Sequence, residues 1–267
     1  MDLVRSKASA TSISPFDCLL FDLDDTLYSS NTGIAQACKN NIEDFLVKKC
    51  GFEAEKAFDL RIKLFRTYGS SLAGLRAFGY DIDADDYHSF VHGTLPYDRL
   101  KPDPRLRNIL QSIAQRKIIF TNSDRNHAMK VVERIGLEDC FDEIICFETL
   151  NPNLWKSKRP DEFPVILKPS IEAIKIAIQV AGTDPRRTLF LDDSDRNIKA
   201  GKALGLRTAL KVGKEVKSKE AEYLVDSISN LEKIIPEIWA ADANGGLARS
   251  GSDMEMESML EAPLIGA

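Results

Sequence analysis

The segment Asp17-Cys-Leu-Leu-Phe-Asp22 is a short apolar run that ends in an acidic residue. A continuous apolar run of this length is typical of a strand buried on both faces, as the strands of parallel sheets are. From Gly33 to His92 the pattern changes, because apolar residues recur at helical spacing and strand-like alternation is absent. We therefore expect a buried first strand followed by an all-helical unit of about four helices.

After Pro102 the sequence alternates between helical and strand-like patterns. The expected strands are residues 117–121, 143–147, 188–192 and 207–210, and the expected helices are residues 106–113, 127–135, 169–180 and 197–204. Strands separated by helices form right-handed βαβ units and a parallel sheet. The pattern predicts an α/β protein with a Rossmann-like, doubly wound parallel sheet core and an inserted all-helical unit.

The helical unit divides the expected core into two pieces. We expect the core to comprise residues 15–31 and 101–235, and the helical insertion to comprise residues 32–100. Residues 1–14 and 240–267 are rich in small and polar residues and carry no core pattern. We expect both of these end segments to be disordered.

The composition argues against several classes of protein. Of 267 residues, 36 are Lys or Arg and 41 are Asp or Glu, which gives a net charge of −5. An acidic chain without a basic run does not favour nucleic acid or a membrane surface as a partner. No apolar stretch approaches the ~18 residues of a membrane span. Residues 1–14 contain no apolar signal-peptide core, although their Ser, Ala and basic residues leave a transit peptide open.

The cysteines and histidines favour neither a disulfide framework nor a zinc site. The sequence holds an odd number of widely scattered cysteines without a C-x-x-C pair: Cys18, Cys38, Cys50, Cys140 and Cys146. Buried thiols in a reducing compartment explain them most simply, so we expect a cytoplasmic protein. The histidines lack ligand-spaced cysteine partners for zinc.

Polar or acidic side chains follow several of the apolar strands. Asp22 and Asp24 follow the first strand, Thr121 ends the second, and Asp192 and Asp193 end the fourth. Ligands of open parallel sheets bind at the carboxyl ends of the strands, so these side chains should converge there. Clustered aspartates near a buried edge repel one another, and a hard divalent cation resolves that repulsion. A small set of carboxylates suits Mg²⁺ better than Ca²⁺.

A single aspartate after a strand has a simpler explanation, because it is more often a helix cap or a turn former than a catalyst. Thr121 and Asn122 could likewise cap the helix that follows them. The functional interpretation is favoured because several such strand ends occur at the expected places in one βαβ pattern.

These residues resemble the motifs of a known superfamily, the haloacid dehalogenase-like (HAD) hydrolases. Phe21-Asp22-Leu23-Asp24-Asp25-Thr26-Leu27 resembles the first motif and Thr121-Asn122 the second. Lys168-Pro169 resembles the third motif, and Leu191-Asp192-Asp193-Ser194-x-x-Asn197-Ile198 the fourth. The resemblance covers about residues 15 to 235, and the helical insertion is similar to the C1 cap of this superfamily.

Two segments of the cap resemble a narrower branch. Residues 67–75 and 87–97 are similar to the pyrimidine 5′-nucleotidase-like proteins of fungi and plants. Plant proteins of this kind include nucleoside monophosphate phosphatases, among them one for xanthosine monophosphate. The resemblance implies an enzyme that hydrolyses a small phosphomonoester, most simply a nucleoside 5′-monophosphate, and we expect a monomer or a homodimer.

The resemblance also implies roles for individual residues. Asp22 would be the nucleophile that forms an aspartyl-phosphate, and Asp24 would act as general acid and then as general base. Mg²⁺ would be held by the Asp22 carboxylate, the Asp24 carbonyl and Asp193, with Asp192 bound directly or through water. Thr121, Asn122 and Ser123 would face the phosphate, and Lys168 would pair with the phosphate and with Asp22. Lys156 and Lys158 are weaker candidates than Lys168 because they do not precede a Pro and a helix start.

The cap would choose the substrate. Its candidate contacts are Tyr68, Arg76 and His92, with Ser70, Ser71 and His88 as further polar residues. His88 and His92 are expected to pack or to hydrogen bond between cap and core rather than to act as acid or base.

Other functions remain as alternatives. A sugar phosphate or flavin mononucleotide phosphatase would use the same residues, as would a phosphomutase. A dehalogenase would not need Asp24 to protonate an alkoxide. A catalytically silent binding protein with this fold would not need Asp22, Asp24, Thr121, Lys168 and Asp193 together.

Overall fold

The computed structural model describes residues 13–154, 164–213 and 218–240. Within them, six parallel strands form one sheet in the order β3-β2-β1-β4-β5-β6. The strands are β1 Cys18–Phe21, β2 Arg116–Phe120, β3 Glu143–Ile145, β4 Thr188–Asp192, β5 Arg207–Lys211 and β6 Tyr223–Val225. From β1 the chain adds β2 and β3 on one side of the sheet and then β4, β5 and β6 on the other, so the strand order reverses between β1 and β4. Ligands of such sheets bind at this point, at the carboxyl ends of the strands.

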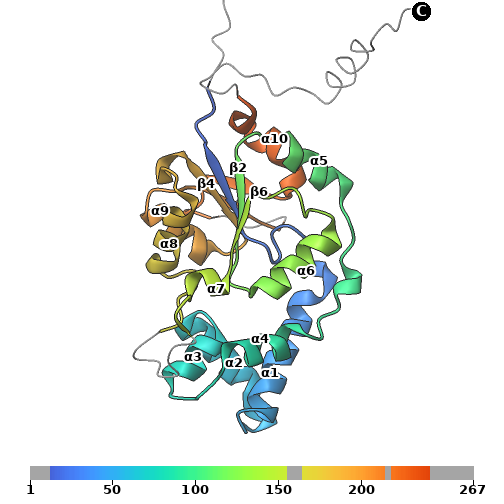
Figure 1. The fold of residues 1–267 in the computed structure, drawn as a ribbon, viewed down its shortest axis with the longest axis vertical. Coiled ribbons are helices and arrows are strands. Elements are labelled where there is room, and N and C mark those ends of the chain that lie inside the picture. The colour runs from blue at the N-terminus through green and yellow to red at the C-terminus, as the bar shows by residue number, and fades with distance from the viewer. Residues whose placement is uncertain (1–12, 155–163, 214–217, 241–267) are drawn as a thin grey trace, which may run out of the picture.

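The helices run along both faces of the sheet and into the insertion. They are α1 Ile34–Lys48, α2 Ala54–Tyr68, α3 Ser71–Ala77, α4 Ala84–His92, α5 Pro104–Ser112, α6 Arg125–Ile135, α7 Phe147–Leu150, α8 Ile171–Ala181, α9 Asp195–Ala203 and α10 Leu231–Ile234. In Figure 1, α8 and α9 lie on one side of the strands, while α5, α6 and α10 lie on the other. The fold is therefore the expected doubly wound α/β architecture.

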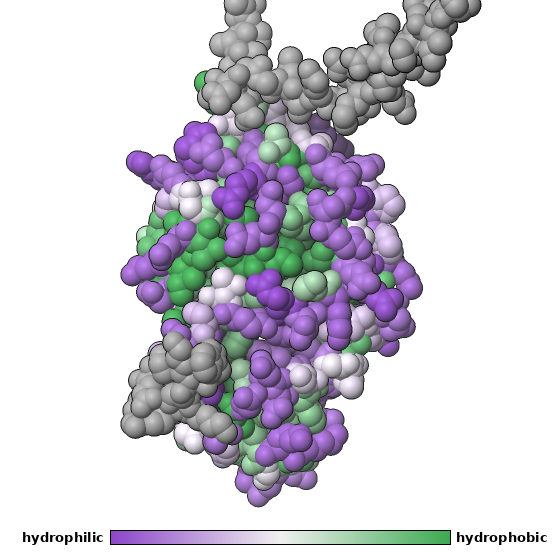
Figure 2. All heavy atoms as spheres, in the orientation of Figure 1, coloured by the Kyte–Doolittle hydropathy of each residue, from purple (hydrophilic) through white to green (hydrophobic). Residues whose placement is uncertain are grey.

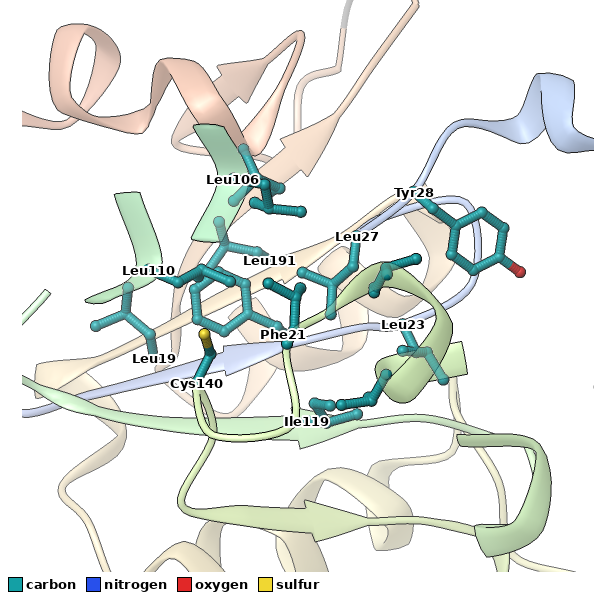
Figure 3. Packing of buried hydrophobic residues seen from close by; sticks show 14 of the residues in the cluster. Leu19, Phe21, Leu23, Leu27, Tyr28, Leu106, Leu110, Ile119, Cys140 and Leu191 are labelled. Atoms are coloured by element: carbon teal, nitrogen blue, oxygen red, sulfur yellow. The ribbon is translucent and has the colours of Figure 1, made fainter. Parts of the chain in front are cut away.

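Two apolar clusters hold the layers together. Leu19 and Phe21 of β1 pack with residues of α5, α6 and α10 on one face of the sheet, as Figure 3 shows for part of this cluster. Cys18 and Leu20 point to the other face, toward α8 and α9. Successive side chains of a strand alternate between faces, so an apolar strand covered on both sides reads as a continuous apolar run. Figure 2 shows hydrophobic residues gathered where the strands lie in Figure 1.

The helices α1 to α4 form the inserted unit and lie beyond one end of the sheet (Figure 1). Phe45, Leu64 and Leu72 of these helices belong to the same apolar cluster as Leu20 of the sheet. The chain enters the unit at Gly33, where a positive φ of 84° suits glycine. A side chain there would also meet the guanidinium of Arg99, in the segment by which the chain returns to the core. The insertion is thus joined to the core by two adjacent segments.

The structure corrects several expected boundaries. The strand expected over 143–147 ends at Ile145, because Phe147 already begins the short helix α7. The helix expected from Pro169 starts at Ile171, because the Ser170 side chain accepts a hydrogen bond from the Ala173 amide and caps it. The sequence pattern also missed β6 and α10, which are too short to show a period.

Most of the two segments expected to be disordered, residues 1–14 and 240–267, lies outside the described residues. Ser14 is described and is buried. Within the described ranges, no helix combines the length and apolarity that crossing a bilayer requires.

Candidate active site at the carboxyl edge of the sheet

A buried lysine joins two of the strand-end aspartates. Lys168 Nζ lies 2.8 Å from Asp22 Oδ1 and 2.8 Å from Asp192 Oδ2, and it donates to the Phe120 carbonyl oxygen at 2.6 Å. The other oxygen of Asp22, Oδ2, accepts a hydrogen bond of 2.7 Å from the Thr26 hydroxyl. The parallel sheet brings these groups together because β1, β2 and β4 end at the same edge.

Burial and charge oppose each other in this cluster. Burial, which outweighs the attraction of Lys168, and then the charges of the neighbouring aspartates raise the pKa of Asp22 well above its ordinary value. Burial alone would lower the pKa of Lys168, but Asp192 and Asp22 outweigh it and raise that pKa. Lys168 is therefore a permanent cation beside Asp22.

The backbone of Lys168 is fixed by Asn122. The Asn122 side chain donates to the Lys168 carbonyl at 2.9 Å and accepts from the Lys168 amide at 2.8 Å. Thr121 is buried beside it, and its hydroxyl accepts a hydrogen bond from the Ser123 amide at 3.1 Å. The Asn122 side chain thus positions the backbone of Lys168, and the contact of Thr121 with phosphate stays a prediction.

Asp24 is held by three side chains. Ser123 donates to Asp24 Oδ2 at 2.7 Å, Tyr28 donates to Oδ1 at 2.7 Å, and His127 Nε2 lies 2.8 Å from Oδ1. Burial opposes ionisation of Asp24, but His127, Tyr28 and Ser123 outweigh it and lower the pKa of Asp24. Burial alone would lower the pKa of His127, but Asp24 raises it. The two groups therefore form an ion pair at the floor of the site.

The remaining aspartates form an oxygen-rich cluster. Carboxylate oxygens of Asp22, Asp192 and Asp193 all lie within 4.8 Å of one another. Asp192 is fully engaged, because Asn197 and the Ser194 amide donate to it in addition to Lys168. The Asp193 carboxylate makes no hydrogen bond within the described residues, and partial burial and the Asp192 charge raise its pKa to about 6. An all-oxygen set with excess negative charge fits Mg²⁺.

The insertion contacts the core at Asp124 and at His127, the partner of Asp24. His92 Nδ1 of α4 pairs with Asp124 Oδ1, and Asp124 Oδ2 accepts from the His127 amide at 3.1 Å and caps α6. The Tyr97 hydroxyl donates to the His92 carbonyl at 3.1 Å and lies 2.8 Å from His127 Nδ1. His92 thus makes a hydrogen bond between cap and core, one of the two roles expected for it.

A cavity of about 330 Å³ lies between the inserted helices and this edge of the sheet. Asp24, Asn122, Ser123 and His127 line its core side. Its cap side is mainly apolar and includes Ile34, Ile42, Leu72, Tyr87 and Val91, and Phe147 of α7 adds an apolar surface from the core. This space adjoins Asp24, so a group that takes a proton from Asp24 can extend into it.

Two predicted cap contacts do not line this cavity in the described part of the chain. Arg76 is buried and donates to the Ile82 carbonyl at 2.9 Å, a hydrogen bond that closes the turn between α3 and α4. Its side chain lines a separate hollow beside α7. Tyr68 is 39% exposed and packs edge-on against Phe78, with ring centroids 5.7 Å apart. His92, Ser70 and Ser71 do line the cavity.

The sequence interpretation missed two residues that the site brings together. His127 is the third residue of α6, and Tyr28 lies four residues after Asp24. A histidine in the first turn of a helix that follows a polar strand end points toward the same sheet edge, and this position was the available signal.

Comparison with known proteins identifies the family. The model of a hydrolase family, haloacid dehalogenase-like hydrolase, matches residues 16–205. Phosphate metabolism protein 8 of Saccharomyces cerevisiae is 29% identical over 195 residues, which cover 70% of this chain and 58% of the yeast protein. The chain therefore matches only a little over half of that relative.

Two further matches, one curated protein and one solved structure, extend over nearly the whole length of the matched protein. Phosphoglycolate phosphatase of Aquifex aeolicus is 24% identical over 229 residues, 81% of this chain and 95% of that protein. The crystal structure of a HAD phosphatase from Thermococcus onnurineus shares the fold, with a TM-score of 0.53 and 18% identity over 82% of this chain and 97% of that chain.

Proposed function

The chain belongs to the haloacid dehalogenase-like hydrolases, and from that premise we propose that it is a Mg²⁺-dependent phosphatase of a nucleoside 5′-monophosphate. The observation that carries the proposal is the Asp22–Lys168–Asp192 cluster beside Asp24, which itself lines the cavity. Relatives that are named as phosphatases support the same reaction class.

The proposed reaction has two steps. An Asp22 carboxylate oxygen attacks phosphorus, the bond between phosphorus and the ester oxygen breaks, and the leaving oxygen takes a proton from Asp24. Water then attacks the aspartyl-phosphate and gives a proton to Asp24, which releases inorganic phosphate and restores the Asp22 carboxylate. Lys168 and Thr121 face the charge on the transferring group, which positioning and electrostatics stabilise.

Asp24 must carry a proton when the leaving oxygen departs. Its hydrogen bonds hold it as a carboxylate before substrate binds. The negative charge of an arriving phosphate raises the pKa of a nearby carboxyl group, so substrate itself favours protonation of Asp24. His127, 2.8 Å away, is the adjacent proton carrier.

The donor set of the acidic cluster fits the proposed metal. Asp193 offers a carboxylate that no described residue engages, and Asp22 and Asp192 lie within reach of the same point. The Asp24 carbonyl is the further ligand that the family resemblance implies. A bound Mg²⁺ would neutralise charge on the phosphate oxygens.

The apolar cavity supports a leaving group with a ring. The walls contributed by α1, α3 and α4 are mainly aliphatic and aromatic, and a small polar leaving group such as glycolate would leave them unfilled. A nucleoside presents an apolar face with polar edges, which suits such a cavity better than a sugar phosphate. The narrower assignment to the pyrimidine 5′-nucleotidase-like branch and the cytoplasmic location stay predictions.

The test is phosphate release by the purified chain from nucleoside monophosphates, sugar phosphates, flavin mononucleotide and phosphoglycolate, with Mg²⁺ or with EDTA. We expect nucleoside monophosphates to be the best substrates, EDTA to abolish release and Mg²⁺ to restore it. Asp193→Asn should raise the Mg²⁺ concentration needed for half-maximal activity, because the site loses a ligand charge. Release at full rate in EDTA would remove the metal from the mechanism, and no release from any phosphomonoester would favour a silent binding protein.

A further inference from the structure

Two polar side chains on the cap side of the cavity are largely enclosed, and few of their hydrogen-bonding atoms have a partner among the described residues. Arg61 of α2 and His88 of α4 both line the cavity, between apolar residues. Neither belongs to the phosphate site. In an apolar wall, a polar group without a protein partner is costly unless a ligand or water satisfies it.

Arg61 is held in place by one of its donors. Its Nε donates to Glu43 Oε1 at 2.8 Å, and the guanidinium lies over the Phe58 ring, 5.3 Å from the centroid. The side chain is only 13% exposed. Its two terminal amino groups have no hydrogen-bond acceptor among the described residues, so an oriented fork of donors remains for a ligand.

His88 is also fixed but unpaired. Its ring packs edge-on against Phe147, with centroids 4.4 Å apart, and stacks on His92 at 5.6 Å. Nδ1 is buried, and neither Nδ1 nor Nε2 makes a hydrogen bond within the described part of the chain. Burial lowers the pKa of His88 to about 4, so the ring is neutral near pH 7 and offers one donor and one acceptor.

The cavity extends from the catalytic floor to this roof. Asp24 lines the floor, where the ester oxygen departs, and the His88, His92 and His127 rings lie in a row that leads to it. A leaving group that fills the cavity therefore has its far end at the cap. That far end is where substrates with the same phosphate differ.

We propose that Arg61 and His88 select the leaving group, and that Arg61 favours a ring that turns carbonyl oxygens toward α2. This inference rests on the proposed function. Arginine has donors and no acceptor, so it pairs with a carbonyl oxygen and leaves an exocyclic amino group unpaired. Inosine monophosphate has a carbonyl where adenosine monophosphate has an amino group, and uridine monophosphate differs from cytidine monophosphate in the same way. Each pair therefore differs in the group to which Arg61 would donate.

The experiment measures kcat and KM for these four nucleotides and for phenyl phosphate, whose ring has no hydrogen-bonding edge. We expect the carbonyl member of each pair to have a kcat/KM about 10-fold or more above its amino partner. Arg61→Met should remove most of that preference, largely through KM, while phenyl phosphate loses much less. The matched control is Arg66→Met, an exposed arginine on the same helix that does not line the cavity.

His88 needs two variants because it is buried. His88→Phe keeps the packing against Phe147 and removes both nitrogens, so KM should rise for every nucleotide and hardly change for phenyl phosphate. His88→Gln returns a donor and an acceptor and should recover part of the loss. Thermal unfolding of each variant identifies a general loss of folding.

The outcomes separate this inference from the proposed function. A wild-type chain that hydrolyses no phosphomonoester overturns both. A chain that hydrolyses phenyl phosphate but shows no preference within the nucleotide pairs, or a preference that survives Arg61→Met, overturns the inference alone. Hydrolysis confined to sugar phosphates would overturn both this inference and the proposed nucleotide substrate.

Discussion

The edge of the sheet and the cavity above it use polar groups in opposite ways. At the edge, Lys168, Asp22 and Asp192 satisfy one another at 2.8 Å. In the cap, Arg61 and His88 stand in an apolar wall with most of their hydrogen-bonding capacity unused. Under the proposed function, the first region acts on the phosphate that all substrates share, and the second contacts the leaving group in which they differ. Reaction and selection are therefore expected to respond to different mutations.

The largest expected effect tests the edge alone. Asp22→Asn keeps the size of the side chain and removes the attacking oxygen charge, so kcat should fall by about four orders of magnitude or more on every substrate. Phosphate release is the measurement, with circular dichroism to confirm folding. Asp17→Asn is the matched control, since Asp17 lies at the opposite end of β1 and pairs with Arg187. Near-normal activity of Asp22→Asn would contradict the covalent mechanism.

The second prediction tests how strongly the edge residues depend on one another. Lys168→Met leaves Asp22 and Asp192 without their shared cation, and the free energy of unfolding at pH 7 should fall by about 3–5 kcal/mol. Urea unfolding measures this. Lys175→Met removes an exposed lysine near Glu172 and should cost at most about 0.5 kcal/mol.

The same variant has a predicted pH dependence. The pKa of Asp22 already lies above its ordinary value in the folded protein, and loss of Lys168 raises it further. A carboxyl group whose pKa is higher in the folded than in the unfolded state lowers the free energy of unfolding at pH values where it is ionised in both states. This loss disappears as pH falls and the group becomes protonated. The stability deficit of Lys168→Met should therefore shrink on acidification, and a constant deficit would contradict this account.

A third, smaller effect is expected where the two regions meet. His92→Asn removes the pairing with Asp124, which holds α4 against the core, and hydrogen bonds to charged groups contribute about 1.5–3 kcal/mol. We expect kcat/KM to fall about 10-fold for nucleotides and phenyl phosphate alike, because closure serves all substrates. Asp124→Asn retains the capping oxygen and should behave similarly. A changed order of substrates would instead assign His92 to recognition.

The smallest effect is expected outside the cavity. Tyr68→Ala removes a ring that packs on Phe78 at the surface of the cap, so the order of substrates should not change. Surface substitutions of this kind change stability by about 0.5 kcal/mol or less. Thermal unfolding and the four-nucleotide panel measure both quantities, and altered selectivity would mean that the cavity extends to Tyr68.

The sequence predicted the positions of site residues well where the geometry of the sheet determines them. Asp22, Thr121 and Asp192 could be placed together because parallel strands deliver their carboxyl ends to one edge. The cap residues could not be placed in this way, since helical spacing shows which face of a helix is apolar but not which turn meets the cavity. Arg76 was consequently predicted as a substrate contact, but it donates to the Ile82 carbonyl and does not line this cavity, whereas Arg61 does line it and was not predicted.

The insertion after β1 also bears on the order in which the chain folds. Neighbouring strands β1 and β2 pair Leu19 with Lys117, about 100 residues apart, because the whole helical unit intervenes. The entropic cost of closing a loop grows with the length of flexible chain between its ends. If α1 to α4 form first from local contacts, they bring Gly33 close to Arg99 and shorten that flexible chain before the central strands meet. In that order of events, the inserted helices that line the cavity would also speed assembly of the sheet.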